Sequence, residues 1–592
     1  MRIALLLLLC IAVLPLCAQQ KNDDNNWVDI SNQYTKKLLK VSMEHNPVFG
    51  SRQGLTEYDE RVPQPTMADE DQERKENEKL LAEMKAAVPQ QKHEQVAQDL
   101  QIIIRQIELG FRTQDYERAH DVPFLNASSM VFGGIRILLD EQTAAERRPA
   151  AVTRIRRYAG LEKGYRPLAD ILRERTMEQM AKPGVFYPAK VEIETELSRD
   201  SHYIEGIEAL LKKYKLTGWE EPFAKLKTQL AEYDAWLKAT VLPKARTDFR
   251  LPPEEYALAL ENYGIDIPPE QMATMAHKGF DEIQAEMKPI AAQIAKERKL
   301  PSSDYRDVIR ELKKQQIVGD AILPLYEDHL KKIEDIIREH EIVTLPDRPA
   351  RIRLATAAET AQQPAPHMVP PPFLHNTGQK GEFVLPLNIP AAPGQKEQKY
   401  DDFTFEAAAW TLTAHEARPG HELQFDSMVE QGVSLARVLY AFNSTNVEGW
   451  GLYSEYLTRP YMPLEGQLVS LDYRLLRAAR AFLDPELQSG KVTPEQAKEV
   501  LEKDVVQSPA FAEEEVERYT YRAPGQANSY YYGYTKLIAL RKDVEKAMGK
   551  KFNQKAFHDF ILRQGLLPPD LMREAVMKDF AGAAKGESGA SR

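Results

Sequence analysis

The residues of this chain that are best suited to chemistry lie in one short segment, H-E-A-R-P-G-H at residues 415–421. Two imidazoles and a carboxylate are what a catalytic zinc ion requires, as ligands and as the base for its water. On an unbroken helix, side chains six positions apart point about 240° apart, so His415 and His421 would face different directions. Pro419 cannot donate a hydrogen bond to the carbonyl of His415, and the glycine after it relaxes the backbone. The sequence therefore predicts a helix that breaks at residues 418–420 and turns His421 back toward His415.

A second interpretation of this segment is an ordinary helix end at a proline-glycine pair, with two histidines nearby by chance. The dipeptide His-Glu begins at residues 93, 340, 415 and 421. The first two have no second histidine close by and fit solvated helix faces. The metal interpretation therefore depends on a third ligand elsewhere in the chain.

The segment after Asn446 offers that ligand on an expected helix. Glu448 and Glu455 are seven residues apart, so two helical turns place them on nearly the same face. Trp450 and its apolar neighbours indicate a buried helix, where an unpaired carboxylate is costly. We favour Glu448 as the third ligand and Glu455 as the carboxylate that orients a ligand histidine. The alternative is a glutamate paired with an arginine in the core.

Composition narrows the class of protein. The chain has 592 residues, a net charge of −11, 43% hydrophobic residues and 28% charged residues. An acidic chain without basic runs disfavours nucleic acid as a partner, and this charge content disfavours a membrane protein with many spans.

Residues 1–18 read as a secretory signal peptide, with a charged start, an apolar stretch and a small-residue cleavage site. The only cysteines, Cys10 and Cys17, lie in this segment, so the exported chain would contain no thiol. Export to the periplasm or the medium is the expectation, without a transmembrane span in the mature chain. An uncleaved anchor, or a lipid on Cys17, are the alternatives.

Helical periodicity dominates the rest of the chain, as in Val152–Arg175, Pro268–Lys299 and Asp304–Glu341. The composition changes near residue 345. We therefore expect a helical N-terminal lobe over residues 19–345 and a catalytic C-terminal lobe over residues 346–592, as two lobes of one large domain.

A small sheet is expected near residues 350–390. Arg351–Ala355 and Glu382–Leu387 fit short strands, and the second could be an edge strand that aligns an extended peptide. The proline-rich segment Pro364–Phe373 is expected to be irregular. His367 and His375 flank it and fit loop residues better than metal ligands.

Three motifs in order resemble the bacterial domain-of-unknown-function family 885. They are H-E-x-x-P-G-H at residues 415–421, E-G-W-x-x-Y-x-E at 448–455 and P-G-Q-A-x-S-Y-x-x-G at 524–533. The resemblance covers almost the whole mature chain. It implies a mainly α, two-lobed zincin-like fold with a deep cleft, and a secreted or periplasmic peptidase. It also implies that His415, His421 and Glu448 bind Zn²⁺ and that Glu416 is the general base.

The third motif suggests further site residues. Tyr530 is the candidate donor to the developing oxyanion, although buried tyrosines more often simply pack helices. Gln526 of the same motif is a candidate for substrate contact. Arg518 and Arg522 could hold a substrate carboxylate, or could pair with the glutamates at 513–517.

Two positions depart from the family pattern. Members often have a histidine at the position of Glu422. Members also often have a G-L-H triplet where this chain has Glu486-Leu487-Gln488, so that Gln488 stands at the position of the histidine.

The expected function is a zinc metallopeptidase acting on short peptides. The alternatives are a zinc hydrolase or ligase acting on a non-peptide amide, and a non-catalytic periplasmic peptide-binding protein.

Overall fold

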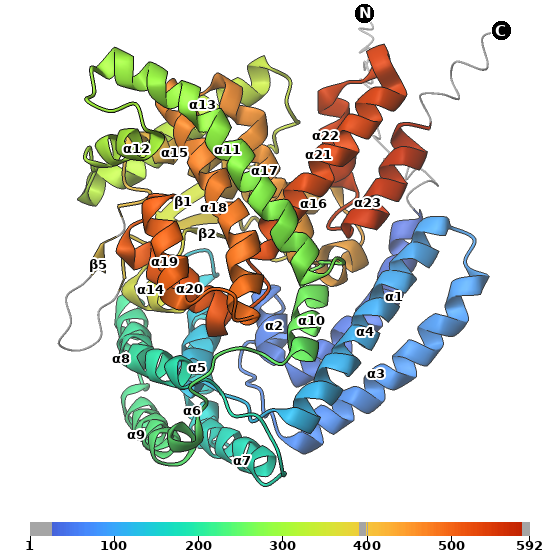
Figure 1. Ribbon diagram of the computed structural model, residues 1–592. Coiled ribbons are helices and arrows are strands. Elements are labelled where there is room, and N and C mark those ends of the chain that lie inside the picture. The colour runs from blue at the N-terminus through green and yellow to red at the C-terminus, as the bar shows by residue number, and fades with distance from the viewer. Residues whose placement is uncertain (1–25, 390–397, 400, 583–592) are drawn as a thin grey trace, which may run out of the picture.

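The computed structural model describes residues 26–389, 398–399 and 401–582, and almost all regular structure in these residues is helical (Figure 1). The mainly α fold expected from the sequence is confirmed. The expected signal peptide, with Cys10 and Cys17, lies outside the described residues. Within them, no helix has the length and apolarity needed to cross a membrane.

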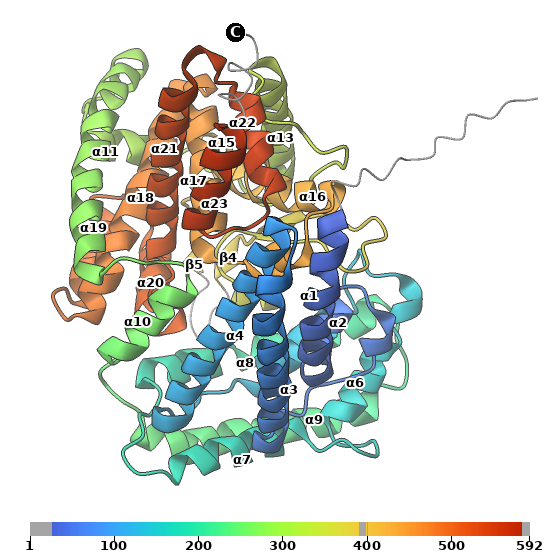
Figure 2. The same cartoon turned by 90° about the vertical axis from the view of Figure 1, so that its right-hand side faces the viewer.

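The N-terminal helices form two groups. Helices α1, α3 and α4 pack side by side (Figure 2), and helices α5 to α9 enclose a separate apolar core. Their bounds are α1 (Asn26–His45), α2 (Pro47–Arg52), α3 (Met67–Ala87), α4 (Glu94–His120), α5 (Ala127–Arg136), α6 (Ala150–Tyr158), α7 (Leu168–Met180), α8 (Lys190–Lys213) and α9 (Glu220–Trp236).

The next four helices pack against the C-terminal part of the chain. They are α10 (Pro253–Asn262), α11 (Pro269–Arg298), α12 (Tyr305–Lys313) and α13 (Ile322–Glu339). Helix α11 runs along α18 (Leu464–Gln488) in Figure 1, and both contribute to the largest apolar core. The lobe boundary expected at residue 345 therefore does not divide the largest apolar core, which contains residues from both sides of it.

The small sheet lies where it was expected, but its strand order differs. Strands β1 (Arg351–Leu354), β3 (Glu382–Leu385) and β2 (His367–Val369) are adjacent in that order. β1 pairs with β3 in parallel, and β2 pairs with β3 antiparallel with Met368 opposite Phe383. The expectation that residues 382–387 form an edge strand is wrong, because both sides of β3 are paired.

The edge strands of this sheet are β1 and β2, and β2 belongs to the proline-rich segment expected to be irregular. That expectation is wrong for His367–Val369. Proline is compatible with the ends of an edge strand, because only one side of such a strand needs donors. The remaining regular elements between α13 and residue 400 are α14 (Ala357–Gln362) and the pair β4 (Asn388–Ile389) and β5 (Gln398–Lys399).

The C-terminal helices surround the segment around residue 415. They are α15 (Glu406–Glu416), α16 (His421–Gln431), α17 (Ser444–Thr458), α18, α19 (Pro494–Lys503), α20 (Pro509–Glu517), α21 (Asn528–Met548), α22 (Gln554–Arg563) and α23 (Pro569–Ala575). Helix α15 is buried from Ala407 onward on all its faces, as its run of alanines and other small residues allows.

Helices α17 and α21 cross at a pair of glycines. A Cβ atom on Gly449 would lie 2.7 Å from the Cα of Gly533, and one on Gly533 would lie 2.0 Å from the carbonyl oxygen of Thr445. Side chains of any size at these two positions would force the helices apart. The backbone contact fixes α17 against α21.

Candidate metal centre

The helix that carries the first histidine ends where the sequence predicts a break. α15 ends at Glu416 and α16 begins at His421. A Cβ on Gly420 would lie 1.8 Å from the carbonyl oxygen of His415, so only glycine fits at this turn. The indole of Trp450 donates a 2.9 Å hydrogen bond to the Pro419 carbonyl and ties the break to α17.

The break brings three potential metal ligands together. The ligand atoms of His415, His421 and Glu448 all lie within 4.8 Å of one another. The Nε2 atoms of His415 and His421 lie 3.4 Å and 3.3 Å from Oε2 of Glu448. Ligands about 2.0–2.1 Å from a tetrahedral zinc ion are about 3.3–3.4 Å apart, so the spacing fits this ion. The three side chains could therefore hold a metal ion with two imidazole ligands and one carboxylate ligand.

Glu455 supports the first histidine from the opposite side of its ring. Its Oε1 lies 2.7 Å from Nδ1 of His415, and its Oε2 accepts a 2.7 Å hydrogen bond from Thr411. A hydrogen bond from Nδ1 to this carboxylate leaves Nε2, which faces Glu448 and His421, available to bind a metal ion. Asn443 caps the start of α17 with a 2.8 Å hydrogen bond from the amide of Asn446, which fixes the helix that carries both glutamates.

We expect Glu455→Gln to weaken zinc binding by about 10–100-fold, since the amide supports the His415 tautomer without supplying charge. Zinc affinity can be measured by competition with a chromophoric chelator. Glu382→Gln is the matched control, because Glu382 is equally buried and ion-paired but lies on β3. Equal zinc affinity in the wild type and Glu455→Gln would contradict the orienting role.

Glu416 shares a cavity with the three ligands. The cavity has a volume of about 280 Å³ and is lined by residues of α15, α16, α17, α18, α21 and β2. Burial raises the pKa of Glu416 to about 8, and the neighbouring imidazole of His421 opposes this shift. A cation at the three ligands would favour the ionised form of Glu416. The carboxyl group is thus suited to accept and return a proton.

Tyr530 and Arg518 lie at the same cavity. The ring centre of Tyr530 is 6.3 Å from that of His415, and its hydroxyl lies 3.4 Å from Nη1 of Arg518. Burial raises the pKa of Tyr530, so its phenol remains a hydrogen-bond donor at neutral pH. Arg518 lies 3.7 Å from Glu515, which agrees with the expected pairing with the glutamates at 513–517, and its contact with a substrate carboxylate stays a prediction.

Two other sequence candidates point elsewhere. Arg522 donates a 3.2 Å hydrogen bond to the backbone carbonyl of Gln362, and Gln526 donates a 3.1 Å hydrogen bond to Ser444. Neither lines the cavity of the three ligands. Both connect the turn before α21 to neighbouring segments.

The two positions that depart from the family pattern have structural partners. Glu422 is fully buried and receives two hydrogen bonds from Arg418, of 2.7 Å and 3.1 Å. Because Arg418 lies between His415 and His421 in the chain, this ion pair fixes the break between α15 and α16. Gln488 accepts a bond from the amide of Leu251 and donates one to the Tyr519 carbonyl, of 2.9 Å and 2.7 Å. The first contact joins α18 to the segment before α10, and the second joins it to the segment after α20.

Sequence reasoning missed two arginines of α18. Arg477 and Arg480 line the cavity, and the guanidinium of Arg480 lies 4.5 Å from the ring centre of Tyr530. Arg480 forms a bidentate ion pair with Glu515, with both contacts at 2.6 Å. Charged residues in an otherwise apolar helix were the available signal, because they are rarely buried without a partner.

Comparison with known proteins identifies the family. The family model described as a bacterial protein of unknown function (DUF885) matches residues 47–576. The chain belongs to this family. No curated protein matches the DUF885 chain in sequence.

Two solved structures are similar to the DUF885 protein. A putative lipoprotein of unknown function from Shewanella oneidensis is 21% identical, with a TM-score of 0.67, over 93% of this chain and 99% of that chain. A putative lipoprotein from Colwellia psychrerythraea is 16% identical, with a TM-score of 0.73, over 94% and 99%. At these identities the two structures establish a shared fold.

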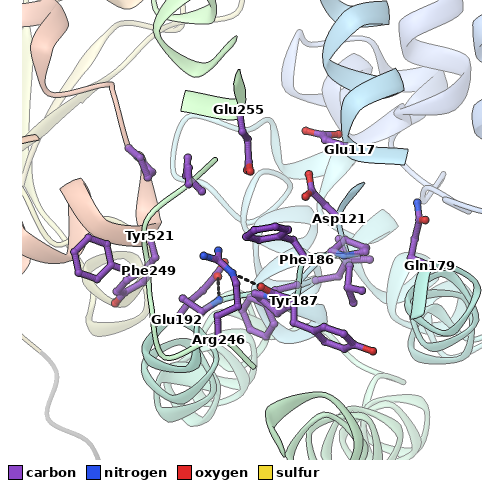
Figure 3. A pocket seen from close by; sticks show the side chains of 18 of the residues that line it. Glu117, Asp121, Gln179, Phe186, Tyr187, Glu192, Arg246, Phe249, Glu255 and Tyr521 are labelled. Atoms are coloured by element: carbon purple, nitrogen blue, oxygen red, sulfur yellow. Dashed lines mark hydrogen bonds between the residues drawn. The ribbon is translucent and has the colours of Figure 1, made fainter. Parts of the chain in front are cut away.

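The DUF885 protein has another cavity away from the metal ligands, of about 460 Å³ (Figure 3). The carboxyl groups of Glu117, Asp121 and Glu255 point toward one another there. Burial and the neighbouring carboxylates raise the pKa of Glu255 to about 7, and burial raises that of Asp121 to about 6. Arg246 lines this cavity, but it donates to the backbone carbonyl of Tyr187.

The raised pKa of Glu255 predicts that replacing this residue with an uncharged one stabilises the DUF885 protein at high pH. The folded state holds the Glu255 proton more tightly than the unfolded state, so stability falls as the pH rises from about 4.5 to 7. Glu255→Gln should raise Tm at pH 8 by an amount on the order of 2 °C and leave it unchanged at pH 4.5. Thermal unfolding at the two pH values checks this. The exposed Glu254→Gln is the control, and an equal gain at both pH values would contradict the explanation.

Proposed function

We propose that this DUF885 protein is an exported zinc-dependent peptidase that hydrolyses short peptides. The observation that carries the proposal is the convergence of His415, His421 and Glu448, with Glu416 beside them in one cavity. Two histidines and a glutamate are an established ligand set of catalytic zinc and leave one position for water. The orientation of His415 by Glu455 supports the same conclusion.

The chemistry divides between the metal and the side chains of the cavity. A bound zinc ion would supply a water of lowered pKa and a Lewis acid for the substrate carbonyl. Glu416 would take a proton from the attacking water and deliver it to the leaving amine. Tyr530 would donate a hydrogen bond to the carbonyl oxygen as negative charge develops there. Arg518 lies against the phenol and favours this orientation.

The shape of the cavity favours short peptides. Its walls combine apolar side chains, including Met368, Phe403 and Phe425, with the polar groups described above. Strand β2 forms part of the wall, and no strand of the described residues pairs with its outer edge, which offers backbone hydrogen bonds to an extended peptide. A cavity of about 280 Å³ enclosed by helices holds a few residues and does not admit a folded protein.

Export is part of the proposal because residues 1–18 have the pattern of a signal peptide. Both similar solved structures are described as putative lipoproteins. Cys17 is the residue of this chain that would carry a lipid after cleavage, and incorporation of a labelled fatty acid into the wild type but not into Cys17→Ala would establish it.

The proposal is tested by metal analysis and by incubation with a defined mixture of short peptides. We expect one zinc ion per chain and hydrolysis that stops on chelation and in Glu416→Gln. Purified protein without bound zinc would overturn the proposal. Zinc binding with cleavage of acylated small molecules alone would indicate an amidase instead, and zinc binding without any turnover would indicate a binding protein.

A further inference from the structure

A larger cavity adjoins the metal cavity along strand β2. It has a volume of about 450 Å³, compared with about 280 Å³ for the metal cavity. Gln363, His367, Met368 and Pro370 line both cavities. A ligand that lies along the edge of β2 would therefore extend from the metal ligands into this second space. We call it the arginine cavity, because Arg52, Arg136 and Arg147 are among its lining residues.

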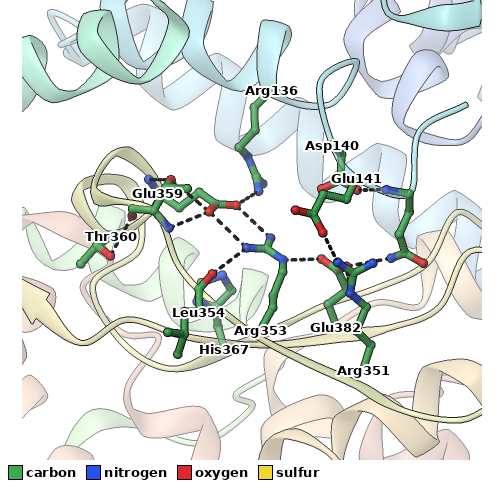
Figure 4. Close-up of polar contacts among 12 residues, drawn as sticks. Arg136, Asp140, Glu141, Arg351, Arg353, Leu354, Glu359, Thr360, His367 and Glu382 are labelled. Atoms are coloured by element: carbon green, nitrogen blue, oxygen red, sulfur yellow. Dashed lines mark hydrogen bonds and ion pairs between the residues drawn. The ribbon is translucent and has the colours of Figure 1, made fainter. Parts of the chain in front are cut away.

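Two of the three acidic residues that line the arginine cavity, Glu359 and Glu382, are paired with arginines. Figure 4 shows Glu359 between Arg136 and Arg353, at 2.6 Å and 2.8 Å. Arg353 and Arg351 also hold Glu382, at 2.7 Å and 3.1 Å. These ion pairs keep the two glutamates from compensating other cations in the cavity.

The remaining acidic and basic groups leave an excess of positive charge. Arg147 is paired with Asp59 at 2.6 Å. Asp140 accepts a 2.8 Å hydrogen bond from the amide of Gln142 and has no arginine or lysine partner in the described part of the chain. Arg52 and Lys380 both line the cavity, and the described residues provide no hydrogen bond or ion pair to either side-chain cation.

Arg52 and Arg136 are the two groups most suited to a shared ligand. The Nε atom of Arg136 is buried and has no hydrogen-bond partner among the described residues. Desolvation and the nearby charge of Arg136 lower the pKa of Arg52. Both guanidinium groups thus line this cavity, and neither Arg52 nor the Nε atom of Arg136 has a polar partner among the described residues, which favours an anion there.

We propose that the arginine cavity binds a carboxylate of the substrate, with Arg52 and Arg136 as its recognition residues. This rests on the proposed peptidase function. Planar guanidinium groups match the geometry of a carboxylate, and such charge-assisted bonds are strong when partly desolvated. The carboxylate is the C-terminus of a short peptide or the side chain of an acidic residue. A peptide that spans both cavities then has its scissile bond at the metal and its anionic group beside α2 and α5.

Binding measurements on zinc-loaded Glu416→Gln protein test this site without turnover. Three peptides are compared by calorimetry: an alanine tetrapeptide with a free C-terminus, its C-terminal amide, and the amide with one glutamate. We expect the free acid to bind about 10–100-fold more tightly than the plain amide, from a charge-assisted pair of about 1.5–3 kcal/mol. Tight binding of the glutamate peptide instead would assign the site to acidic side chains.

Substitution of Arg52 tests the proposed carboxylate site without altering the metal ligands. Arg52→Gln in the same background should remove most of the preference for the acid and leave the affinity of the plain amide unchanged, while Arg52→Lys should retain part of it. Arg563→Gln is the control, because Arg563 is exposed on α22 and lines neither cavity. Equal binding of all three peptides, or a preference that survives Arg52→Gln, would overturn the inference.

The outcomes also distinguish this inference from the proposed function. A preference for the acid that depends on Arg52, in a protein whose wild type cleaves no peptide, would leave the carboxylate site and remove the peptidase. Peptide cleavage without any such preference would leave the peptidase and remove the carboxylate site.

Discussion

Glu416→Gln should lower kcat/KM for short peptides by about 10²–10⁴-fold, while the zinc content remains at the wild-type value. The amide cannot accept the proton of the attacking water, whereas the three ligands do not include this residue. The loss corresponds to about 3–5 kcal/mol of transition-state stabilisation. Metal analysis and initial rates on the same preparations give both quantities.

The matched control for this variant is Glu94→Gln. Glu94 follows a histidine as Glu416 does, but it lies at the start of α4 and pairs with Lys578 on the surface. Its replacement should leave rate and zinc content at wild-type values. Full hydrolysis by Glu416→Gln would show that this carboxylate is not the base and would remove the main support for the mechanism.

Gly451→Ala should abolish stoichiometric zinc binding. A Cβ at this position on α17 would lie 2.7 Å from Nε2 of His415 and 2.8 Å from Cε1 of His421. Both rings would have to move away from Glu448, and the added methyl group should also cost about 1–3 kcal/mol of stability through overpacking. Zinc stoichiometry and thermal unfolding of the metal-free protein measure the two effects separately.

Gly110→Ala is the control for this substitution. Gly110 lies inside α4, and a Cβ there meets no other atom within 4 Å. Alanine is the better helix former by about 1 kcal/mol, so Tm should rise slightly without a change in zinc binding. Wild-type zinc binding by Gly451→Ala would show that the two rings do not lie against this glycine.

The helix break between the two histidines and the shared face of the two glutamates could be predicted, because residues close together in the sequence determine both features. Pro419 and Gly420 end a helix wherever they occur in one, and the seven-residue spacing of Glu448 and Glu455 places them on one face. The structure shows both features. The metal ion and the catalytic roles stay predictions.

The other wall of the site could not be predicted, because long-range packing decides it. Arg52 lies more than 300 residues before the ligand histidines in the chain, and no periodicity connects it to them. For the same reason, α11 was assigned to the N-terminal lobe although it packs on α18. The order of the strands was also open, since short apolar runs do not specify which strand is central.

The crossing of α17 and α21 limits where substitutions could change the specificity of the proposed binding site. Glu448 precedes Gly449 by one residue, and Tyr530 precedes Gly533 by one helical turn. The backbone contact between the two glycines therefore fixes the helix that carries Glu448 against the helix that carries Tyr530. Substitutions that enlarge or reshape the binding site are consequently confined to the opposite side, at β2, the proline segment and α2. Engineering of new specificity should begin there, because changes on α17 or α21 would alter the proposed catalytic groups together with the pocket.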